Sequence, residues 1–262
     1  MRLATFLPEG SSTPRAGEVH DGQVIAFADE SLSVLECLAD PALAVSGDLS
    51  WPLGEVRLLA PVARPRAIFG IGLNYADHIA ETGGQTPENP IVFMKLPSSA
   101  ADPGGAVTCP PVVRRLDYEG ELAVVMGAGG EVAGYAVADD LSARDLQGRE
   151  PQWTRAKGAD GFCPYGPWVT TADEVSDPHS LELRTWVNGE LRQRSSTSNL
   201  IFDVPRLVSF IGETCTLEPG DLILTGTPNG VGMAMDPPRF LQTGDVVRIE
   251  IERLGYIEHP IA

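Results

Sequence analysis

Two glutamates separated by one residue, Glu119 and Glu121, are the side chains of this sequence best placed to do chemistry. The apolar run at 122–126 predicts a β-strand, in which residues two apart point to the same face. Two adjacent carboxylates repel each other, and a cation between them would turn that repulsion into attraction. A third carboxylate, Asp140, follows the next apolar run at 132–138. We interpret Glu119, Glu121 and Asp140 as an all-oxygen site for a hard divalent ion.

The types of donor atom in this site indicate which ion it would bind and whether substrate could reach that ion. Three hard oxygens without a thiolate or imidazole favour such an ion over zinc or copper. Three protein ligands on an octahedral ion would leave positions open for substrate and water. Two alternatives stay open: a strand-face carboxylate pair that is solvated or paired with arginine, and a structural calcium site.

A short helix is expected at residues 75–81, ended by Gly83 and Gly84. His78 and Glu81 are three apart on it, so their side chains can meet, and the carboxylate could orient the imidazole and raise its basicity. The alternative is an exposed ion pair on a surface helix. The polar segment at 85–89 is expected to be mobile, as in a lid over a binding site.

A glycine-rich turn at 225–230 contains Gly226 and Thr227. Its backbone N–H groups could converge on an anion, and a substrate carboxylate would be the natural guest. The alternative is a tight β-turn without a ligand. A nucleotide-binding loop is excluded because the Gly-Lys-Ser/Thr sequence is missing here, and Tyr75 replaces the third glycine of the dinucleotide fingerprint that begins at Gly70.

Only two of the 19 basic residues, Lys95 and Lys157, are lysine. Lysine differs from arginine because it presents a compact charge and can lose its proton when buried. This bias favours a functional role for both lysines. The alternative is that both are chance survivors of a general preference for arginine.

The remaining pattern predicts a β-rich α+β fold in two parts. A small N-terminal α+β domain at 1–60 would contain three short strands and one helix at 31–38, with Ser31 as N-cap. A hinge at 61–65 would lead into a catalytic domain at 61–262. The elements expected in this domain are strands at 67–72, 91–95, 181–187, 221–225 and 246–251, and a helical region at 197–211.

Composition narrows the classes of function. The chain of 262 residues has a net charge of −17, which disfavours nucleic acid and anionic membranes as partners. No apolar run is long enough to span a bilayer, and the first residues lack a signal peptide's apolar core, so a cytoplasmic location is expected. The four widely spaced cysteines are expected to be reduced, mostly structural thiols.

Five sequence blocks resemble the fumarylacetoacetate hydrolase family, in the family's order, across residues 61–261. Each block alone would be a weak signal, and all five in order are a strong one. The blocks are GLNYADH (72–78), LDYEGEL (116–122), DLSARDLQ (140–147), AKG (156–158) and TGTPNGVG (225–232).

The resemblance implies a mixed β-sheet roll as the catalytic domain and a homodimer. It also implies that Glu119, Glu121 and Asp140 bind Mg²⁺ or Mn²⁺, and that a lid helix carries the His78–Glu81 pair, which activates water.

The resemblance further implies that Lys157 points into the pocket and orients or polarises the substrate, where Gln147 could bind the same substrate oxygen. Lys95 matches a family position near the site, although a structural pair with an acidic neighbour explains it almost as well. Arg144 could bind a substrate carboxylate, but we favour a role as a clamp on Asp145 or on the metal-binding acids.

These residues indicate a substrate that is a 2-oxo acid or β-dicarbonyl, including dicarboxylates. The main hypothesis is metal-dependent hydrolysis of a C–C bond in an acylpyruvate-type substrate, with enolate charge stabilised by the ion. The alternative is isomerase or decarboxylase chemistry on 2-oxo or 2-hydroxy-dienoic diacids at the same site. A non-catalytic binder of small dicarboxylates is the second alternative.

Overall fold

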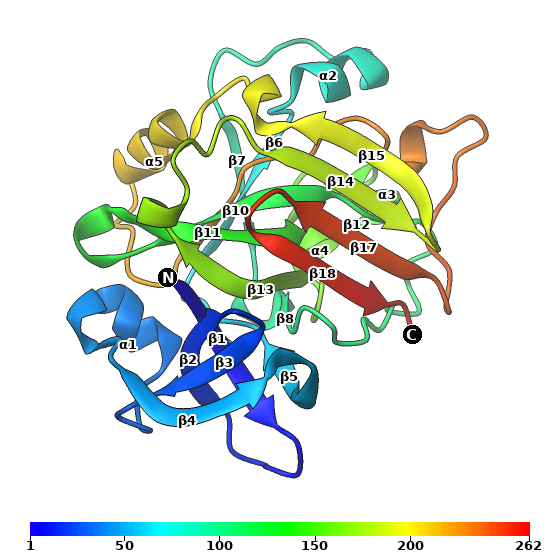
Figure 1. The fold of residues 1–262 in the computed structure, drawn as a ribbon. Coiled ribbons are helices and arrows are strands. Elements are labelled where there is room, and N and C mark those ends of the chain that lie inside the picture. The colour runs from blue at the N-terminus through cyan, green and yellow to red at the C-terminus, as the bar shows by residue number, and fades with distance from the viewer.

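Two β-sheets and a short strand pair make up most of the fold (Figure 1). The computed structural model describes residues 1–262, except for the side chain of Thr82. The large sheet has 12 strands, in which β5 (Val56–Leu59) pairs with β1 and β8 (Ala100–Ala101) pairs with β13, beside the main path. The order along that path is β4 (Ser46–Pro52), β3 (Gln23–Phe27), β2 (Arg15–His20), β1 (Arg2–Pro8), β13 (Cys163–Thr171), β11 (Val132–Asp139), β10 (Gly120–Met126), β16 (Leu222–Leu224), β6 (Ile68–Gly72) and β7 (Ile91–Lys95).

The second sheet has four strands, and a further pair of strands lies beside the site. The four strands run in the order β15 (Glu190–Ser196), β14 (Glu182–Val187), β17 (Val246–Ile251) and β18 (Gly255–Pro260), and the pair is β9 (Leu116–Asp117) with β12 (Ser142–Ala143). The helices are α1 (Val34–Ala39), α2 (Ala76–Thr82), α3 (Arg144–Gln147), α4 (Thr154–Lys157) and α5 (Val204–Gly212). This strand-rich α+β architecture agrees with the fold class predicted from the sequence.

Strand β10 is buried along its whole length because both of its faces meet a core. Residues two apart share a face, so Leu122 and Val124 pack into the core that also includes residues of the four-stranded sheet. Ala123 and Val125 point the other way, into the core beneath α1. A strand buried on both faces is held rigidly, and Glu121 is the second residue of this strand, so its backbone is held in the same way.

The N-terminal strands belong to the same sheet as the site. β1 pairs antiparallel with β13, with Arg2 opposite Thr170 and Leu3 opposite Val169. Downstream, the hydroxyl of Tyr165 donates to the Val62 carbonyl at 2.6 Å and accepts from the Val62 N–H at 2.8 Å. The division of the chain near residue 60 stays a prediction.

Two expected helices differ in their bounds. Helix α1 begins after Ser33, because Ser33 and Glu36 form a reciprocal capping box, so the prediction of Ser31 as N-cap was wrong. The side chain of Ser31 instead donates to Asp29 at 2.7 Å. The region at 197–211 divides into a 3₁₀ turn and α5, because Asp203 caps α5 with a bond to the Arg206 N–H at 2.9 Å.

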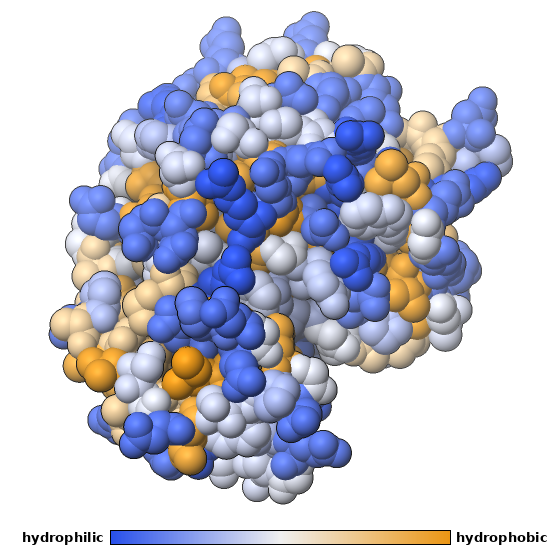
Figure 2. All heavy atoms as spheres, viewed as in Figure 1, coloured by the Kyte–Doolittle hydropathy of each residue, from blue (hydrophilic) through white to orange (hydrophobic). Residues whose placement is uncertain are grey.

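Thiols and helix lengths agree with the expectations from composition. All four cysteines are free, and burial raises the pKa of Cys37 to about 11 and that of Cys163 to about 12, which makes these two thiols unreactive. Among the described residues, every helix is too short or too polar to cross a membrane. On the face shown in Figure 2, polar residues predominate and apolar residues form small separate groups.

Candidate active site

The antiparallel hairpin of β10 and β11 brings the three predicted metal-binding acids together. Gly120 lies opposite Asp139, so Glu119 and Asp140 meet at the open end of the hairpin, where the Asp140 N–H donates to the Glu119 carbonyl at 2.9 Å. Glu121, two residues beyond Glu119, shares that face. All three are buried, and one carboxylate oxygen of each lies within 4.8 Å of the others. The spacing argument from sequence therefore describes the geometry correctly.

The electrostatics of the triad match a site for a hard cation. Burial, together with repulsion from Asp140 and Glu119, raises the pKa of Glu121 well above its usual value. Glu119 behaves in the opposite way, because the cations of Lys157 and Arg144 outweigh its burial and lower its pKa to about 2. The nearby Lys157 ammonium is thus too little positive charge to offset the burial and repulsion at Glu121. Oxygen donors alone, close together and short of one cation, fit Mg²⁺ or Mn²⁺.

Lys157 lies directly against the triad. From the end of α4, its Nζ donates to Glu119 Oε2 and to Asp140 Oδ2, both at 2.7 Å. Burial disfavours its charged form, but the carboxylates of Asp140 and Glu119 outweigh that effect and raise the pKa of Lys157. Lys157 is therefore a fixed cation and not a base.

Lys95 is also buried, but its contacts are with protein groups. Its Nζ donates to Asp140 Oδ1 at 2.6 Å, to the Leu141 carbonyl at 3.4 Å and to the Lys157 carbonyl. Within the described part of the chain these contacts agree with the alternative interpretation of Lys95, a structural pair with an acidic neighbour. A contact between Lys95 and substrate stays a prediction.

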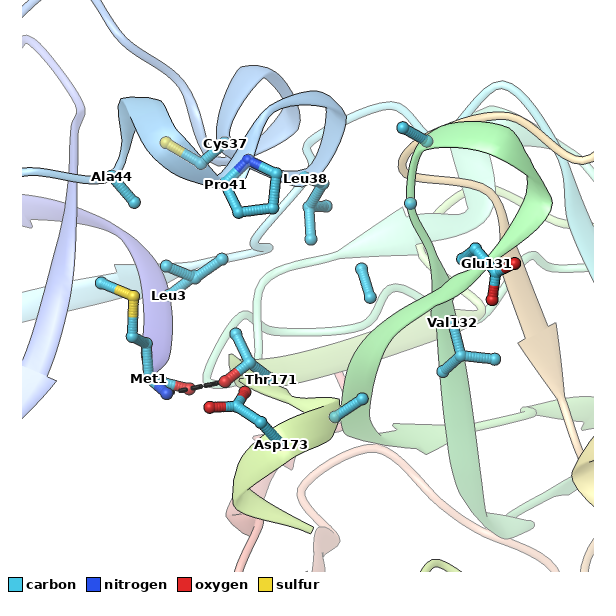
Figure 3. Close-up of a pocket in the computed structure, with 14 residues that line it drawn as sticks. Met1, Leu3, Cys37, Leu38, Pro41, Ala44, Glu131, Val132, Thr171 and Asp173 are labelled. Atoms are coloured by element: carbon cyan, nitrogen blue, oxygen red, sulfur yellow. Dashed lines mark hydrogen bonds between the residues drawn. The ribbon is translucent and has the colours of Figure 1, made fainter.

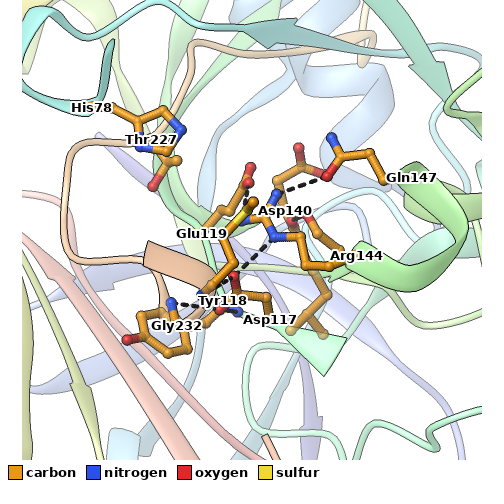
Figure 4. A network of polar contacts seen from close by, with 12 residues as sticks. His78, Asp117, Tyr118, Glu119, Asp140, Arg144, Gln147, Thr227 and Gly232 are labelled. Carbon is orange, nitrogen blue, oxygen red and sulfur yellow. Dashed lines mark hydrogen bonds and ion pairs between the residues drawn. The ribbon is translucent and has the colours of Figure 1, made fainter. Parts of the chain in front are cut away.

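Arg144 clamps two acids from the side opposite His78 in the view of Figure 4. Its Nε donates to Asp117 Oδ2 at 2.8 Å, and its Nη2 lies 2.6 Å from Glu119 Oε1. Its Nη1 donates to Gln147 Oε1 at 3.0 Å, which leaves the Gln147 amide nitrogen as the group that could reach a substrate oxygen. Arg144 therefore contacts Glu119, one of the acids predicted to bind the ion, and its other acidic partner is Asp117 and not Asp145.

The turn at 225–230 closes one side of the site. The Gly226 N–H donates to Glu121 Oε2 at 2.6 Å, so it holds a carboxylate of the protein. The Thr227 hydroxyl donates to the Gly120 carbonyl at 3.1 Å and accepts from Gln193 Nε2 at 2.8 Å. That Gly226 and Thr227 receive a substrate carboxylate stays a prediction.

Helix α2 presents the predicted histidine–carboxylate pair. His78 Nδ1 lies 3.4 Å from Glu81 Oε2, and Glu81 Oε1 accepts from the Gly230 N–H at 2.9 Å. Asp77 on the same helix accepts from the Ser195 hydroxyl at 2.7 Å. These contacts dock α2 onto the turn and onto β15, with His78 facing the cavity.

A small cavity of about 50 Å³ lies among these residues. Phe93 and Trp153 form one wall with an edge-on contact, their ring centres 5.4 Å apart, and Lys157 Nζ lies 5.2 Å from the Phe93 ring centre. The cavity is lined by Ile71, Gly72, Leu73, His78, Phe93, Glu119, Arg144, Gln147, Trp153, Lys157 and Thr227.

Larger hollows lie elsewhere but lack a comparable set of polar groups. A cavity of about 420 Å³ between α1 and the ends of β11 and β13 is mainly apolar (Figure 3). Its polar contacts include the bond from the Met1 amine to Thr171 Oγ1 at 2.6 Å. A cavity of about 720 Å³, lined by residues that include Arg57, Trp168 and Tyr256, is larger still. Size alone would select that cavity, whereas the chemistry selects the cavity of about 50 Å³ beside the triad.

Sequence reasoning left three buried polar residues of this region without a role. Asp117 accepts from the N–H groups of Gly232 and Met233, at 2.8 and 3.1 Å, and so links two of the sequence blocks. Asp139 accepts from the Glu119 N–H at 2.8 Å. Gln193 has no signal in the sequence, because it comes from a strand of the other sheet. Asp117 lies within one of the blocks that contain the triad, and Asp139 directly precedes the other, which is the signal that could have found them.

The chain is similar to a known protein family and to individual known proteins. A family model described as "Fumarylacetoacetate (FAA) hydrolase C-terminal" matches residues 67–262. A mitochondrial oxaloacetate tautomerase of Rattus norvegicus is 45% identical over 217 residues, which cover 79% of this chain and 69% of that protein.

Two solved structures match the full length of the chain. A 5-carboxymethyl-2-hydroxymuconate delta-isomerase from Mycobacterium smegmatis has a TM-score of 0.83 and 36% identity, covering 100% of this chain and 99% of that one. A fumarylacetoacetate hydrolase from Exiguobacterium antarcticum has a TM-score of 0.88 and 37% identity, with the same two coverages. Relatives of this chain thus include proteins named as tautomerase, isomerase and hydrolase.

Proposed function

Because the chain belongs to the fumarylacetoacetate hydrolase family, we propose that it is a metal-dependent tautomerase or isomerase of a 2-oxo dicarboxylic acid. The observation that carries this proposal is the buried triad of Glu119, Glu121 and Asp140 with the Lys157 ammonium against it. The names of similar proteins favour this chemistry over C–C hydrolysis, which was the first hypothesis from sequence.

Glu119, Glu121 and Asp140 would hold Mg²⁺ or Mn²⁺. When bound, such an ion supplies Lewis acidity for the 2-oxo oxygen and charge to stabilise an enolate. The other groups of the site then have to bind the substrate's carboxylates, exclude water and move one proton.

Keto–enol exchange of a 2-oxo diacid moves one proton between C3 and the oxygen on C2, through an enolate. Lys157 contributes a fixed positive charge next to the developing oxyanion, in a site from which water is largely excluded. Because it is already in place, it needs no reorganisation as the charge forms. Arg144 keeps Glu119 in position for the same event.

The His78–Glu81 pair is the group of the site that can carry the proton. Glu81 contacts Nδ1 of His78 and so orients the ring, whose other nitrogen, Nε2, can accept or donate a proton. In the direction of ketonisation the imidazole removes the enol proton, the double bond shifts from C2=C3 to C2=O, and the imidazolium returns the proton to C3. The C–H bond is the only σ bond to carbon that is made or broken.

The same pair supports a second candidate function, hydrolysis of an acylpyruvate. His78, oriented by Glu81, would deprotonate a water that attacks the distal carbonyl, and the C–C bond would then break with the enolate as leaving group. This reaction consumes water, whereas tautomerisation does not, so the two are distinguishable by their products.

The two functions are tested by one set of assays with the purified protein, with and without Mg²⁺ or Mn²⁺. We expect faster decay of the enol absorbance of oxaloacetate and no cleavage products from acylpyruvates. Stoichiometric release of pyruvate from an acylpyruvate, without acceleration of enol decay, would show that the protein is a hydrolase and not a tautomerase. Acceleration of neither reaction would contradict both.

A further inference from the structure

A closed ring of hydrogen bonds lies behind the triad and centres on Gln193, a residue of β15 that is fully buried. Its Oε1 accepts from the Gly120 N–H at 3.0 Å, and its Nε2 donates to Thr227 Oγ1 at 2.8 Å and to the Pro228 carbonyl at 2.9 Å. The Thr227 hydroxyl closes the ring by donating to the Gly120 carbonyl at 3.1 Å.

The chemistry of the partners fixes the direction of each bond. The Gly120 N–H can only donate and the Pro228 carbonyl can only accept, so the orientation of the Gln193 amide is determined. Both protons on Nε2 are then used. The Thr227 hydroxyl has a single proton, and that proton is committed to the Gly120 carbonyl.

This assignment determines which Thr227 group can serve a ligand. Its hydroxyl proton is occupied, and its backbone N–H has no acceptor among the described residues, although Thr227 lines the cavity. The neighbouring Gly226 N–H is held by Glu121. Of the donors of residues 226 and 227, the Thr227 N–H alone remains for an incoming carboxylate.

The ring joins the two parts of the site that must keep a fixed distance. Gly120 lies between the ligands Glu119 and Glu121, and Thr227 and Pro228 belong to the turn that faces the substrate. A side chain at position 120 is excluded, because a Cβ there would lie 2.4 Å from Thr185 Oγ1. Glycine thus allows the four-stranded sheet to approach closely enough for Gln193 to reach both parts.

We propose that Gln193 is a positioning residue for substrate binding. It locks the Thr227 hydroxyl and aligns the turn against the metal-binding strand, so that the Thr227 backbone N–H binds a carboxylate of the substrate. This inference rests on the proposed function, since it assigns a donor for one carboxylate of the 2-oxo diacid.

The test compares Gln193→Met with a matched control, Thr185→Val. Thr185 lies directly opposite Gln193 on β14, is equally buried, and has a hydroxyl without a partner among the described residues. Calorimetry measures the affinity of the Mg²⁺-loaded proteins for malonate, a dicarboxylate that cannot tautomerise, and kinetics measure KM and kcat for oxaloacetate.

We expect Gln193→Met to weaken malonate binding and to raise KM, each by about tenfold, as for a lost bond to a charged group. kcat should change much less, because Lys157 and His78 are untouched. Thr185→Val should match the wild type in all three quantities. The rival interpretation is that the Thr227 hydroxyl itself donates to the substrate. Gln193→Met would then remove the bond that restricts rotation of this hydroxyl, and malonate affinity would be unchanged or higher. That result would overturn the proposal.

A second variant keeps the test decisive if Gln193→Met does not fold. Gln193→Asn keeps the amide but is one methylene too short to reach Gly120 and the turn together, and should weaken malonate binding similarly. Where Gln193→Met folds, its combination with Thr227→Val should bind malonate no worse than the weaker of the two single variants, because both changes break one ring.

Failure of this inference and failure of the proposed function give different results. A wild-type protein that binds malonate but turns over no 2-oxo diacid refutes the function, while the comparison of affinities still decides the role of Gln193. A wild-type protein that does not bind malonate overturns the inference.

Discussion

At the scale of residues, the candidate site carries more buried negative charge than its buried basic side chains can neutralise. Four buried carboxylates, those of the triad and Asp117, face three buried basic side chains, which gives 3 − 4 = −1 when all are ionised. Asp139 is left out of this sum because it pairs with His259 at 3.0 Å. The raised pKa of Glu121 is the local consequence of that deficit. A divalent cation would change the balance to about +1, which suits a dianionic substrate in a protein of net charge −17. The seven residues are Asp117, Glu119, Glu121, Asp140, Lys95, Arg144 and Lys157.

Replacing Lys157 tests the fixed-cation role. Lys157→Met should lower kcat for oxaloacetate tautomerisation by about a hundredfold, as when one oxyanion donor is removed. Mg²⁺ affinity, measured by calorimetry, should be maintained or increased, because a cation that competes for Glu119 and Asp140 is gone. Lys157→Arg should not restore kcat, since a planar guanidinium cannot make both contacts in the same way. A kcat within twofold of wild type for Lys157→Met would exclude the role.

Replacing His78 tests the proton carrier. His78→Ala should reduce kcat by at least about a hundredfold, the usual range for loss of a general acid or base, with little change in malonate affinity. Imidazole added to the assay should restore part of the rate. Undiminished turnover by this variant would show that a group other than His78 transfers the proton.

At the scale of elements, the β10–β11 hairpin explains what could be predicted from the sequence. Alternation within a strand placed Glu119 and Glu121 on one face, and the next apolar run placed Asp140 beside them. The partners Asp117 and Gln193 could not be derived in this way, because their contacts cross from the hairpin to other strands and turns. Local periodicity carries no information on which distant strand packs against a given face.

The N-terminal strands show the same limit. The existence of β1, β2 and β3 followed from turn residues and apolar runs, whereas that of β4 and β5 and the pairing of β1 with β13 did not. The N-cap of α1 was predicted wrongly for a different reason. Two serines precede the helix, and the one that caps it is the one with a glutamate three residues later.

A change at Glu121 tests the hairpin as a metal site. Glu121→Gln removes a repelled carboxylate, so the metal-free variant should have a Tm equal to or above that of the wild type. Mg²⁺ at 100 times its Kd should stabilise the wild type by about 2.7 kcal/mol and should leave the variant unchanged. Glu131→Gln, at an exposed position away from the site, serves as control and should keep the full effect. Equal stabilisation of Glu121→Gln would remove Glu121 from the ligand set.

At the scale of the whole molecule, one 12-stranded sheet carries both the N-terminal strands and the metal hairpin. The four-stranded sheet packs on it and supplies Gln193 to the back of the site. The site therefore depends on contacts between both sheets, and we expect the stability of the N-terminal part to be coupled to that of the rest, because β1 pairs with β13.

The link through Tyr165 tests this coupling. Tyr165→Phe leaves the N–H and carbonyl of Val62 without their partner and should lower the free energy of unfolding by about 2 kcal/mol. Urea denaturation measures the change and shows whether unfolding stays a single transition. Tyr256→Phe is the control, because Tyr256 is 48% exposed and its ring contact with Arg248 is kept. Equal stabilities of the two variants would contradict the link.

The central claim, that three acids grip a divalent cation, is tested most directly by a crystal structure of the protein grown with Mn²⁺. We predict a single strong anomalous peak bonded to oxygens of Glu119, Glu121 and Asp140, with Lys157 still in contact with Glu119 or Asp140. A crystal containing Mn²⁺ at a concentration that supports turnover, but with no peak among these oxygens, would contradict the account.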